Sequence, residues 1–475
     1  MYTRHDYIEQ IRFAGANKTG TFTGAQFTGE TLSLTETSAG TSNLVINVAS
    51  GTTATFTNLT AGSGFTNGSD TITISGVGGN ENITGPNLVT TINGGSGDDT
   101  IVAGTQNDTI DGGDGEDTLT GGTGDDTYLF DTNDVDGNES DADAAIASLE
   151  RGETHYTRGP GSIELCTKIS EQLNRLWNLT STPESVMVTP GAKQALLYAM
   201  MVTMESGDEM LVPSPAWPTY DGQAALLGIK PVFTATNENF HPDLENMRDS
   251  ITTKTRCILI NSPNNPTGAV YTPEEIQAIV DLAVEHDLWI ISDEIYARLV
   301  WSEWPHVSPA SLQGGKDRTL VVTGFSKSFA MTGWRLGVLS GPEDAMSAAF
   351  ACQANANSHV PTFLMPAAEV ALEQDETVNE FCEHYLKRRA ILCEGIDALP
   401  GLNLRSPEGA FYAFIDITGT GMNAIEFADK ALAEARVQLI PGSLIQGGEG
   451  HVRVSYATDE SQIIEGIKRL KSWLI

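Results

Sequence analysis

The sequence predicts a multidomain chain with an all-β N-terminal part that contains a parallel β-roll, followed by an α/β part with a mostly parallel sheet and a smaller α+β domain. Its 475 residues exceed what a single hydrophobic core usually holds. A nine-residue repeat precedes residue 130, and apolar strands alternate with helical segments after residue 144. We expect segments at 1–75, 76–130, 131–143, 144–340 and 341–475.

Acidic residues dominate the chain, and their distribution supports this division. The net charge is −35, and residues 1–143 hold only three basic residues against 21 acidic ones. No lysine or arginine lies between Lys18 and Arg151. Such a surface disfavours nucleic acid and anionic membranes as partners and favours cations as ligands. No run of about 18 apolar residues is present, so no membrane span is expected.

Cysteine usage and the first residues bear on the compartment. All five cysteines follow residue 143 and form no CxxC motif, which is typical of reduced thiols in a cytoplasmic enzyme. The opening MYTRHDYIEQIRF has no continuous apolar stretch, so we expect no signal peptide.

Residues 19–75 are rich in Thr, Ser, Gly and Asn. The segments LSLTET, LVINVA and TATFTNL alternate polar and apolar residues, which predicts short strands. We expect a β-rich structural segment, comparable to surface-layer or adhesin sequences, without chemistry of its own.

Four repeats of nine residues follow: GGSGDDTIV, AGTQNDTID, GGDGEDTLT and GGTGDDTYL, over 94–129. Their aligned aspartates are Asp99, Asp108, Asp117 and Asp126, and their aligned apolar residues are Ile101, Ile110, Leu119 and Tyr128, with weaker copies at Ile92, Ile83 and Ile74. The glycines permit left-handed turns, and stacked carboxylate and carbonyl oxygens suit Ca²⁺. The pattern resembles the RTX calcium-binding repeats, which form a parallel β-roll and would suggest an extracellular protein.

That resemblance implies that one turn takes two repeats. Asp99 would then face Asp117, and Asp108 would face Asp126, as the calcium ligands. An acidic disordered linker is the alternative, but it gives no reason for apolar residues to keep the register. The next stretch, DTNDVDGNESDAD, is not an EF-hand, because Gly137 at loop position 6 places Thr132 at position 1 and Asp143 at position 12. We predict an acidic linker there.

In the second part, three apolar strands end in polar residues. Cys257–Ile260 leads to Asn265, Leu288–Ile291 leads to Asp293, and Leu320–Val322 leads to Lys327. The carboxyl edge of a parallel sheet is where α/β proteins bind ligands. We therefore expect these three side chains to converge on one site.

Two further segments point to the same site. The strand VMVTP runs into Gly191, Ala192 and Lys193 at a helix start, where free backbone N–H groups favour an anion such as phosphate. After SPNNPTG, Thr272, Pro273 and Glu275 predict a helix that begins with a capping box.

Over residues 144–475 these motifs resemble the class I aminotransferases of fold type I, of the aspartate and aromatic type. The resemblance implies pyridoxal 5′-phosphate (PLP) as cofactor and the transfer of an amino group from an amino acid to a 2-oxo acid. Lys327 would hold PLP as a Schiff base and shuttle a proton, Asp293 would pair with the ring nitrogen, and Tyr296 and Asn265 would contact the ring hydroxyl. Trp217 would stack on the ring, and Ser326, Arg335 and the turn from Gly191 to Lys193 would hold the phosphate. Arg453 would bind the substrate carboxylate, and Tyr156 would reach the phosphate of the neighbouring subunit in a homodimer.

The family's N-terminal arm and its GxPDFxTP segment over the substrate are not found ahead of Ala144, where the repeats stand instead. Only Phe130, Asp131 and Thr132 echo part of that segment. Alternatives therefore stay open: a calcium-binding structural or secreted module with an inactive enzyme half, or a lyase or racemase on the same scaffold. The amino donor and the dimer are not determined by the sequence.

Overall fold

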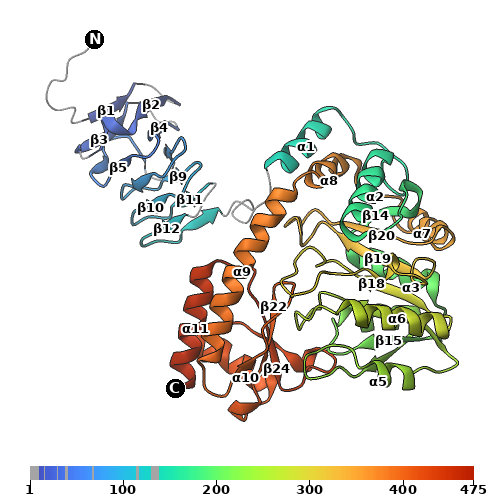
Figure 1. Ribbon diagram of the computed structural model, residues 1–475. Coiled ribbons are helices and arrows are strands. Elements are labelled where there is room, and N and C mark those ends of the chain that lie inside the picture. Colours follow the sequence, from blue (N-terminus) through green and yellow to red (C-terminus); the bar gives the residue numbers. More distant parts are fainter. Residues whose placement is uncertain are drawn as a thin grey trace. The chain divides into compact units, whose positions relative to one another are not determined.

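The computed structural model describes residues 10–14, 17–28, 30–37, 41–66, 69–113, 117–129 and 139–475. The chain divides into Met1–Gly137, here unit 1, and Asn138–Ile475, here unit 2 (Figure 1). Phe130 and positions 131–138 of the predicted linker lie outside the described residues. Positions 139–143 of that predicted linker belong to helix α1 (Glu139–Glu150), whose alanines favour a helix.

Unit 1 consists of short strands that pair in parallel throughout. They are β1 (Gln10–Phe13), β2 (Thr19–Thr23), β3 (Leu32–Glu36), β4 (Asn43–Asn47), β5 (Thr53–Thr55), β6 (Leu59–Ala61), β7 (Thr71–Ser75), β8 (Asn82–Thr84), β9 (Thr91–Asn93), β10 (Thr100–Val102), β11 (Thr109–Asp111), β12 (Thr118–Thr120) and β13 (Thr127–Leu129). They form sheets with the orders β1-β3-β6, β12-β10-β8-β5 and β13-β11-β9-β7-β4-β2. The three segments predicted as strands before residue 75 form β3, β4 and β5. Because β7 pairs with both β4 and β9, the ladder continues across the expected boundary at residue 75.

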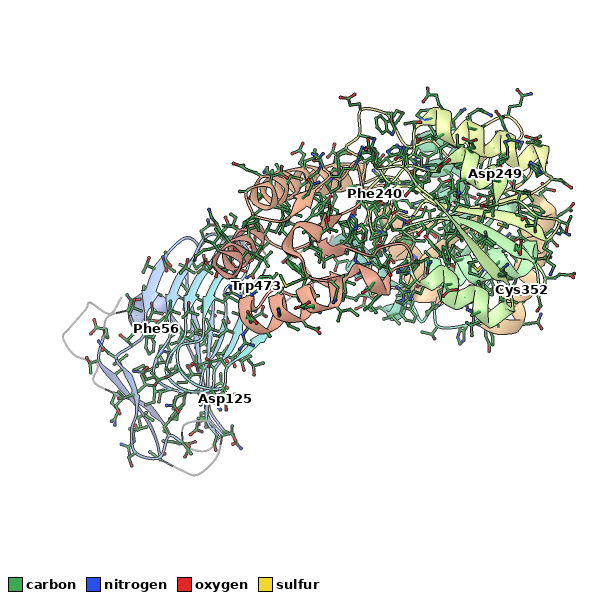
Figure 2. The ribbon with its side chains drawn as sticks, turned by 90° about the horizontal axis from the view of Figure 1, so that it is seen from below. Phe56, Asp125, Phe240, Asp249, Cys352 and Trp473 are labelled. Carbon is green, nitrogen blue, oxygen red and sulfur yellow. The ribbon has the colours of Figure 1, made fainter. Side chains whose placement is uncertain are left out.

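The repeats stack with a period of two repeats per turn. Thr100 pairs with Thr118 on one side of the roll, and Thr109 pairs with Thr127 on the other. This register places Asp99 next to Asp117 and Asp108 next to Asp126, as expected. The aligned isoleucines from 74 to 110 are fully buried and form one core with upstream residues such as Phe56, which is labelled in Figure 2.

The larger part of unit 2 is built on a seven-stranded sheet. Its strands are β14 (Val186–Pro190), β15 (Glu209–Pro213), β16 (Lys230–Thr234), β17 (Thr255–Asn261), β18 (Trp289–Asp293), β19 (Thr319–Gly324) and β20 (Leu336–Ser340). Their order is β14-β20-β19-β18-β17-β15-β16, and β20 runs antiparallel to the others. The three strands predicted to carry polar residues, β17, β18 and β19, are direct neighbours.

Helices cover both faces of this sheet (Figure 1). They are α2 (Ile163–Trp177), α3 (Ala192–Thr203), α4 (Thr219–Leu227), α5 (Leu244–Asp249), α6 (Pro273–Glu285), α7 (Glu343–Ala356) and α8 (Met365–Ala371). Successive side chains of the strands point to opposite faces of the sheet. Leu259 and Ile291 pack with α3, α4 and α7, whereas Ile258 and Ile290 pack with α5 and α6. The predicted capping box is confirmed, since Thr272 and Glu275 bond reciprocally at the start of α6.

The C-terminal domain places helices against a small antiparallel sheet. Its elements are α9 (Asp375–Asp397), β21 (Asn403–Leu404), β22 (Tyr412–Asp416), α10 (Ala424–Lys430), β23 (Ile440–Pro441), β24 (His451–Ser455) and α11 (Glu460–Leu474). The strand order is β21-β22-β24-β23, so Arg453 stands on an inner strand. No helix in the described parts of the chain is long and apolar enough to cross a membrane.

Candidate functional site

A cavity of about 240 Å³ opens at the carboxyl edge of the large sheet. The ends of β17, β18 and β19 bring Asn265, Asp293 and Lys327 into its wall, so the three side chains converge as expected. The C-terminal domain closes another side. The predicted residues in the lining are Ala192, Lys193, Trp217, Asn265, Asp293, Tyr296, Ser326, Lys327, Arg335 and Arg453.

Asp293 is the buried acid of the cavity. It is 2% exposed, and its carboxylate accepts hydrogen bonds from the Tyr220 hydroxyl at 2.8 Å and the Ile295 N–H at 3.3 Å. Burial raises the pKa of Asp293 to about 6, although the Tyr220 hydrogen bond opposes that shift. Asp293 is therefore an anion at neutral pH in a place where little solvent can stabilise it.

Lys327 lies in the same wall and carries a perturbed amine. Burial, and then the positive charges of Arg335 and Arg453, lower the pKa of Lys327. Its Nζ lies 5.4 Å from the centre of the Phe411 ring. A lowered pKa increases the fraction of neutral amine, which is the form that can act as nucleophile or base.

Backbone N–H groups and a guanidinium provide a place for an anion. Helix α3 begins at Ala192, and Gly191 before it has φ +80°. A Cβ at Gly191 would overlap the Arg335 guanidinium, so a glycine lets that side chain approach the helix start. Ser326 lines the cavity beside them. This combination suits a phosphate.

The opposite wall carries Arg453 on β24. Its Nη1 donates to Asn265 Oδ1 at 2.9 Å, and its guanidinium lies 4.8 Å from the centre of the Tyr412 ring. Tyr296 donates its hydroxyl hydrogen to Tyr412 at 3.1 Å. Arg453 is thus held at the cavity with donors available for a carboxylate.

Two predicted cofactor residues are not in the cavity wall: Gly191, which lies against Arg335, and Tyr156, which stands apart. The Tyr156 side chain is 89% exposed. It contacts the His359 ring, with 5.6 Å between the ring centres.

Several residues of the cavity wall were not predicted from the sequence. They are Tyr220, Asn261, Ile295, Thr332 and Tyr412. Asn261 directly follows the predicted strand Cys257–Ile260, and Ile295 lies two positions after Asp293, so the strand positions could have indicated them. Tyr220 and Tyr412 lie outside the strands that define the site, and only the folded arrangement brings them to it.

Two of the four predicted calcium ligands in unit 1 are buried. Asp99 and Asp108 are each 1% exposed. The repeat aspartates form two columns, one on each side of the roll. In each column an Asp accepts the backbone N–H of the residue one turn earlier, as in Glu81 to Asp99 at 2.6 Å and Asp99 to Asp117 at 2.7 Å on one side, and Asp108 to Asp126 at 2.9 Å on the other. Hydrogen bonds therefore link successive turns along each column.

Glu81 continues the column of Asp99 and Asp117 beyond the predicted repeats. Glu81 Oε2 and Asp99 Oδ2 are buried and lack a hydrogen-bond donor among the described atoms. Burial and the neighbouring charges of Glu81 and Asp117 raise the pKa of Asp99 to about 6. In the described residues no three His, Cys, Asp or Glu side chains are grouped for a metal, so a cation here needs backbone carbonyl ligands as well. The spacing of 18 residues from Asp99 could have revealed Glu81.

Sequence comparison identifies both units. The description "Aminotransferase class I and II" matches residues 126–470, and "RTX calcium-binding nonapeptide repeat (4 copies)" matches residues 93–128. The chain belongs to the class I and II aminotransferases. The aminotransferase match begins inside the last repeat, upstream of the expected start at Ala144. The four repeats predicted over 94–129 are confirmed.

Known proteins similar to this aminotransferase come from several organisms. Aromatic-amino-acid aminotransferase 2 of Thermococcus litoralis is 37% identical over 348 residues, covering 72% of this chain and 89% of the relative. The solved aromatic aminotransferase from Pyrococcus horikoshii OT3 has a TM-score of 0.70 at 38% identity, with 72% of this chain and 93% of that chain covered. The solved Thermus thermophilus aspartate aminotransferase with maleate has a TM-score of 0.68 at 38% identity, covering 71% and 89%. Unit 2 therefore has the fold type I architecture.

PLP, which the aminotransferase family implies, fits the residues present. The helix start at Ala192 with Arg335 offers an anion site, and buried Asp293 offers a carboxylate for a protonated ring nitrogen. Lys327 offers an amine of lowered pKa in the same cavity. The donor set thus matches the phosphate, ring and aldehyde groups of PLP.

Proposed function

We propose that unit 2 transfers an amino group from an amino acid to a 2-oxo acid, with Lys327 as the covalent attachment point of PLP and as the catalytic base. The observation that carries this assignment is that Lys327 and Asp293, from neighbouring strands, line one cavity with Arg453. PLP, when bound, supplies an electron sink for the substrate's Cα electrons.

Each residue then has a definite task. Arg453 holds the substrate carboxylate, with Asn265 fixing its guanidinium. The neutral Lys327 amine would accept the proton from the substrate Cα. Asp293 would pair with the ring nitrogen, and Tyr220 fixes the Asp293 carboxylate. Ser326, Arg335 and the Gly191–Lys193 turn would hold the phosphate, Trp217 would stack on the ring, and Tyr296 would contact the ring hydroxyl.

A transamination assay of the full chain tests the function. Aspartate, aromatic amino acids and alanine would each be offered with 2-oxoglutarate, because relatives bear aspartate and aromatic aminotransferase names. Glutamate formation is expected with at least one donor. Bound PLP without any amino transfer would favour the inactive-module alternative, whereas racemised or eliminated products would favour the lyase or racemase alternative.

We further propose a homodimer in which Tyr156 reaches the partner's phosphate site. Its 89% exposure and its absence from the cavity of its own chain support this role. Nearby apolar side chains are also exposed, namely Ile146, Leu149 and Ile163. A second copy would cover such residues.

Mixing two defective variants tests this dimer. Tyr156→Ala is expected to lose about tenfold or more in activity, since a hydrogen bond to a charged group is removed. Co-refolded with inactive Lys327→Ala, it should regain about a quarter of the wild-type activity, because half of the dimers then hold one intact site. Lys327→Ala mixed with Asp293→Asn is the matched control and should regain nothing, since both residues of a site come from one chain. Equal activity in the two mixtures would contradict the shared site.

For unit 1 we propose Ca²⁺ binding along both sides of the roll, with Asp99 and Asp117 as ligands on one side, Asp108 and Asp126 on the other, and Glu81 as a further ligand beside Asp99. Ca²⁺ at a hundred times its Kd should stabilise unit 1 by about 2.7 kcal/mol per site. Calorimetry of the full chain with and without Ca²⁺ would measure this. Glu81→Gln and Asp99→Asn should each weaken the effect, while Asp125→Asn should not, because Asp125 is exposed (Figure 2). An unfolding transition of unit 1 that is the same with and without Ca²⁺ would refute the proposal.

We assign the enzyme unit to the cytoplasm. All five cysteines are unpaired, which supports a reducing compartment.

A further inference from the structure

His241 lies in the loop between β16 and α5, buried where the two domains of unit 2 meet. The residue before it, Phe240, has a left-handed backbone conformation with φ +62°. The Phe240 ring packs against Phe414 of β22 and against His451, with ring centres 5.9 Å and 5.7 Å apart (Figure 2 labels Phe240). This loop of the large domain is therefore docked on the C-terminal domain.

The His241 imidazole is bonded on both sides by carboxylates from different domains. Its Nδ1 lies 2.7 Å from Glu275 Oε2, at the start of α6, and its Nε2 lies 3.1 Å from Glu408 Oε2, just before β22. The His241 side chain is 6% exposed, and those of Glu275 and Glu408 are 20% and 13% exposed. We call this arrangement the His241 bridge.

The bridge is anchored to backbone at both ends. Glu275 Oε2 also accepts the Thr272 N–H at 2.8 Å, and Glu408 Oε2 also accepts the Val270 N–H at 3.0 Å. The N–H groups of Glu408 and Gly409 both donate to the Gly268 carbonyl, at 2.9 Å and 2.8 Å. The segment 408–412 thus lies directly on the loop 264–270.

Both of these segments carry residues of the cavity. The loop 264–270 holds Asn265, which is bonded to Arg453, and the segment 408–412 ends in Tyr412, which is bonded to Tyr296. A Cβ at Gly268 would overlap Pro407 and crowd the carbonyl of Tyr412, so the two segments pack closely. A change in their separation would therefore change the distance between the walls of the cavity.

We propose that His241 is a positioning residue, which, as an imidazolium held between Glu275 and Glu408, fixes the segment 408–412 against the loop 264–270 and so sets the width of the cavity. The effect on catalysis rests on the function proposed above, whereas the bridge itself does not. Its specific requirement is a proton on both ring nitrogens. A neutral imidazole has only one N–H, so deprotonation would leave one carboxylate facing a lone pair.

The charges around the ring keep it protonated. The groups that face it are Glu275 from α6, Glu408 from the C-terminal domain and the Tyr271 ring at 6.1 Å, and Arg405 pairs with the other oxygen of Glu408 at 3.4 Å. Burial opposes the charge, but the hydrogen bonds to the two carboxylates raise the pKa of His241 to about 9. The pKa of His241 in the folded state exceeds its ordinary value of 6.5. The bridge therefore contributes its full stabilisation of the folded state below pH 6.5, and this contribution is lost as the pH rises through about 9.

Amide hydrogen exchange on the full chain with PLP tests the proposal, after correction for the intrinsic pH dependence of exchange. His241→Gln and Glu408→Gln should each speed exchange in peptides spanning 264–270 and 405–412 at pH 7, by about tenfold or more. The wild type should show the same increase only between pH 8 and 10. His286→Gln, an exposed histidine at the other end of α6, is the matched control and should show neither change.

Steady-state kinetics of the same variants add the catalytic readout. At pH 7 the KM for the 2-oxo acid should be higher in His241→Gln than in the wild type. Between pH 7 and pH 10 the KM of His241→Gln should stay constant, whereas the wild-type KM should increase. Unchanged exchange in both variants would overturn the proposal. It would also be overturned if the wild type showed no increase in exchange between pH 8 and 10, or if His241→Gln showed the same increase. If exchange changes as expected in a chain without transaminase activity, the bridge stands and the proposed function falls.

Discussion

Lys327→Ala should lower kcat for transamination by at least about 10⁴-fold, because it removes both the attachment point of the cofactor and the base that moves the Cα proton. Borohydride reduction followed by peptide mapping should find PLP covalently bound at position 327 in the wild type and unbound in the variant. Lys316→Ala changes an exposed lysine and serves as the control. A covalent adduct that persists in Lys327→Ala would show that another residue holds the cofactor.

Asp293→Asn should separate activity from stability. The amide cannot keep the ring nitrogen protonated, so kcat should fall by about 10²–10³-fold, as when one preorganised electrostatic partner is removed. KM should change much less, because Asp293 does not contact the substrate carboxylate in the proposed arrangement.

The stability of the cofactor-free chain should change in the opposite direction. The pKa of Asp293 is raised to about 6 from an ordinary 3.8, so its charged form destabilises the fold increasingly as the pH rises from 3.8 through about 6. Asp293→Asn removes this penalty and should stabilise the cofactor-free chain at pH 8 by at most about 3 kcal/mol. Thermal unfolding at pH 5 and pH 8 checks the sign, with the exposed Asp317→Asn as control. A variant less stable than wild type at pH 8 would contradict this account of the buried carboxylate.

Most of the site could be predicted because its residues lie where strands end. Asn265, Asp293 and Lys327 follow apolar runs, and the sheet order then makes their strands neighbours. Tyr220 and Tyr412 could not be predicted in this way. Tyr220 reaches Asp293 across 73 positions of sequence, and an aromatic residue in a helix is normally part of a core.

The His241 bridge could not be predicted from the sequence either. Its partners are 34 and 167 positions away, and no local pattern marks a histidine that meets two glutamates. In unit 1 the fold was predictable because the repeats impose their own register, but the burial of Asp99 and Asp108 depends on backbone N–H groups one turn away. The features that could not be predicted therefore depend on contacts between residues far apart in the sequence, which no local pattern marks.

The parallel register of unit 1 constrains how its length can change. Successive turns in the repeat region are offset by 18 positions, and alternate nine-residue repeats belong to different sheets. Removing or duplicating 18 residues would leave every remaining strand in its own sheet, whereas a nine-residue change would transfer each downstream strand to the opposite side. A change of 18 residues therefore keeps the C-terminal end of the roll in the same sheet, whereas a change of nine residues would move that end, from which the chain continues into unit 2, to the other sheet.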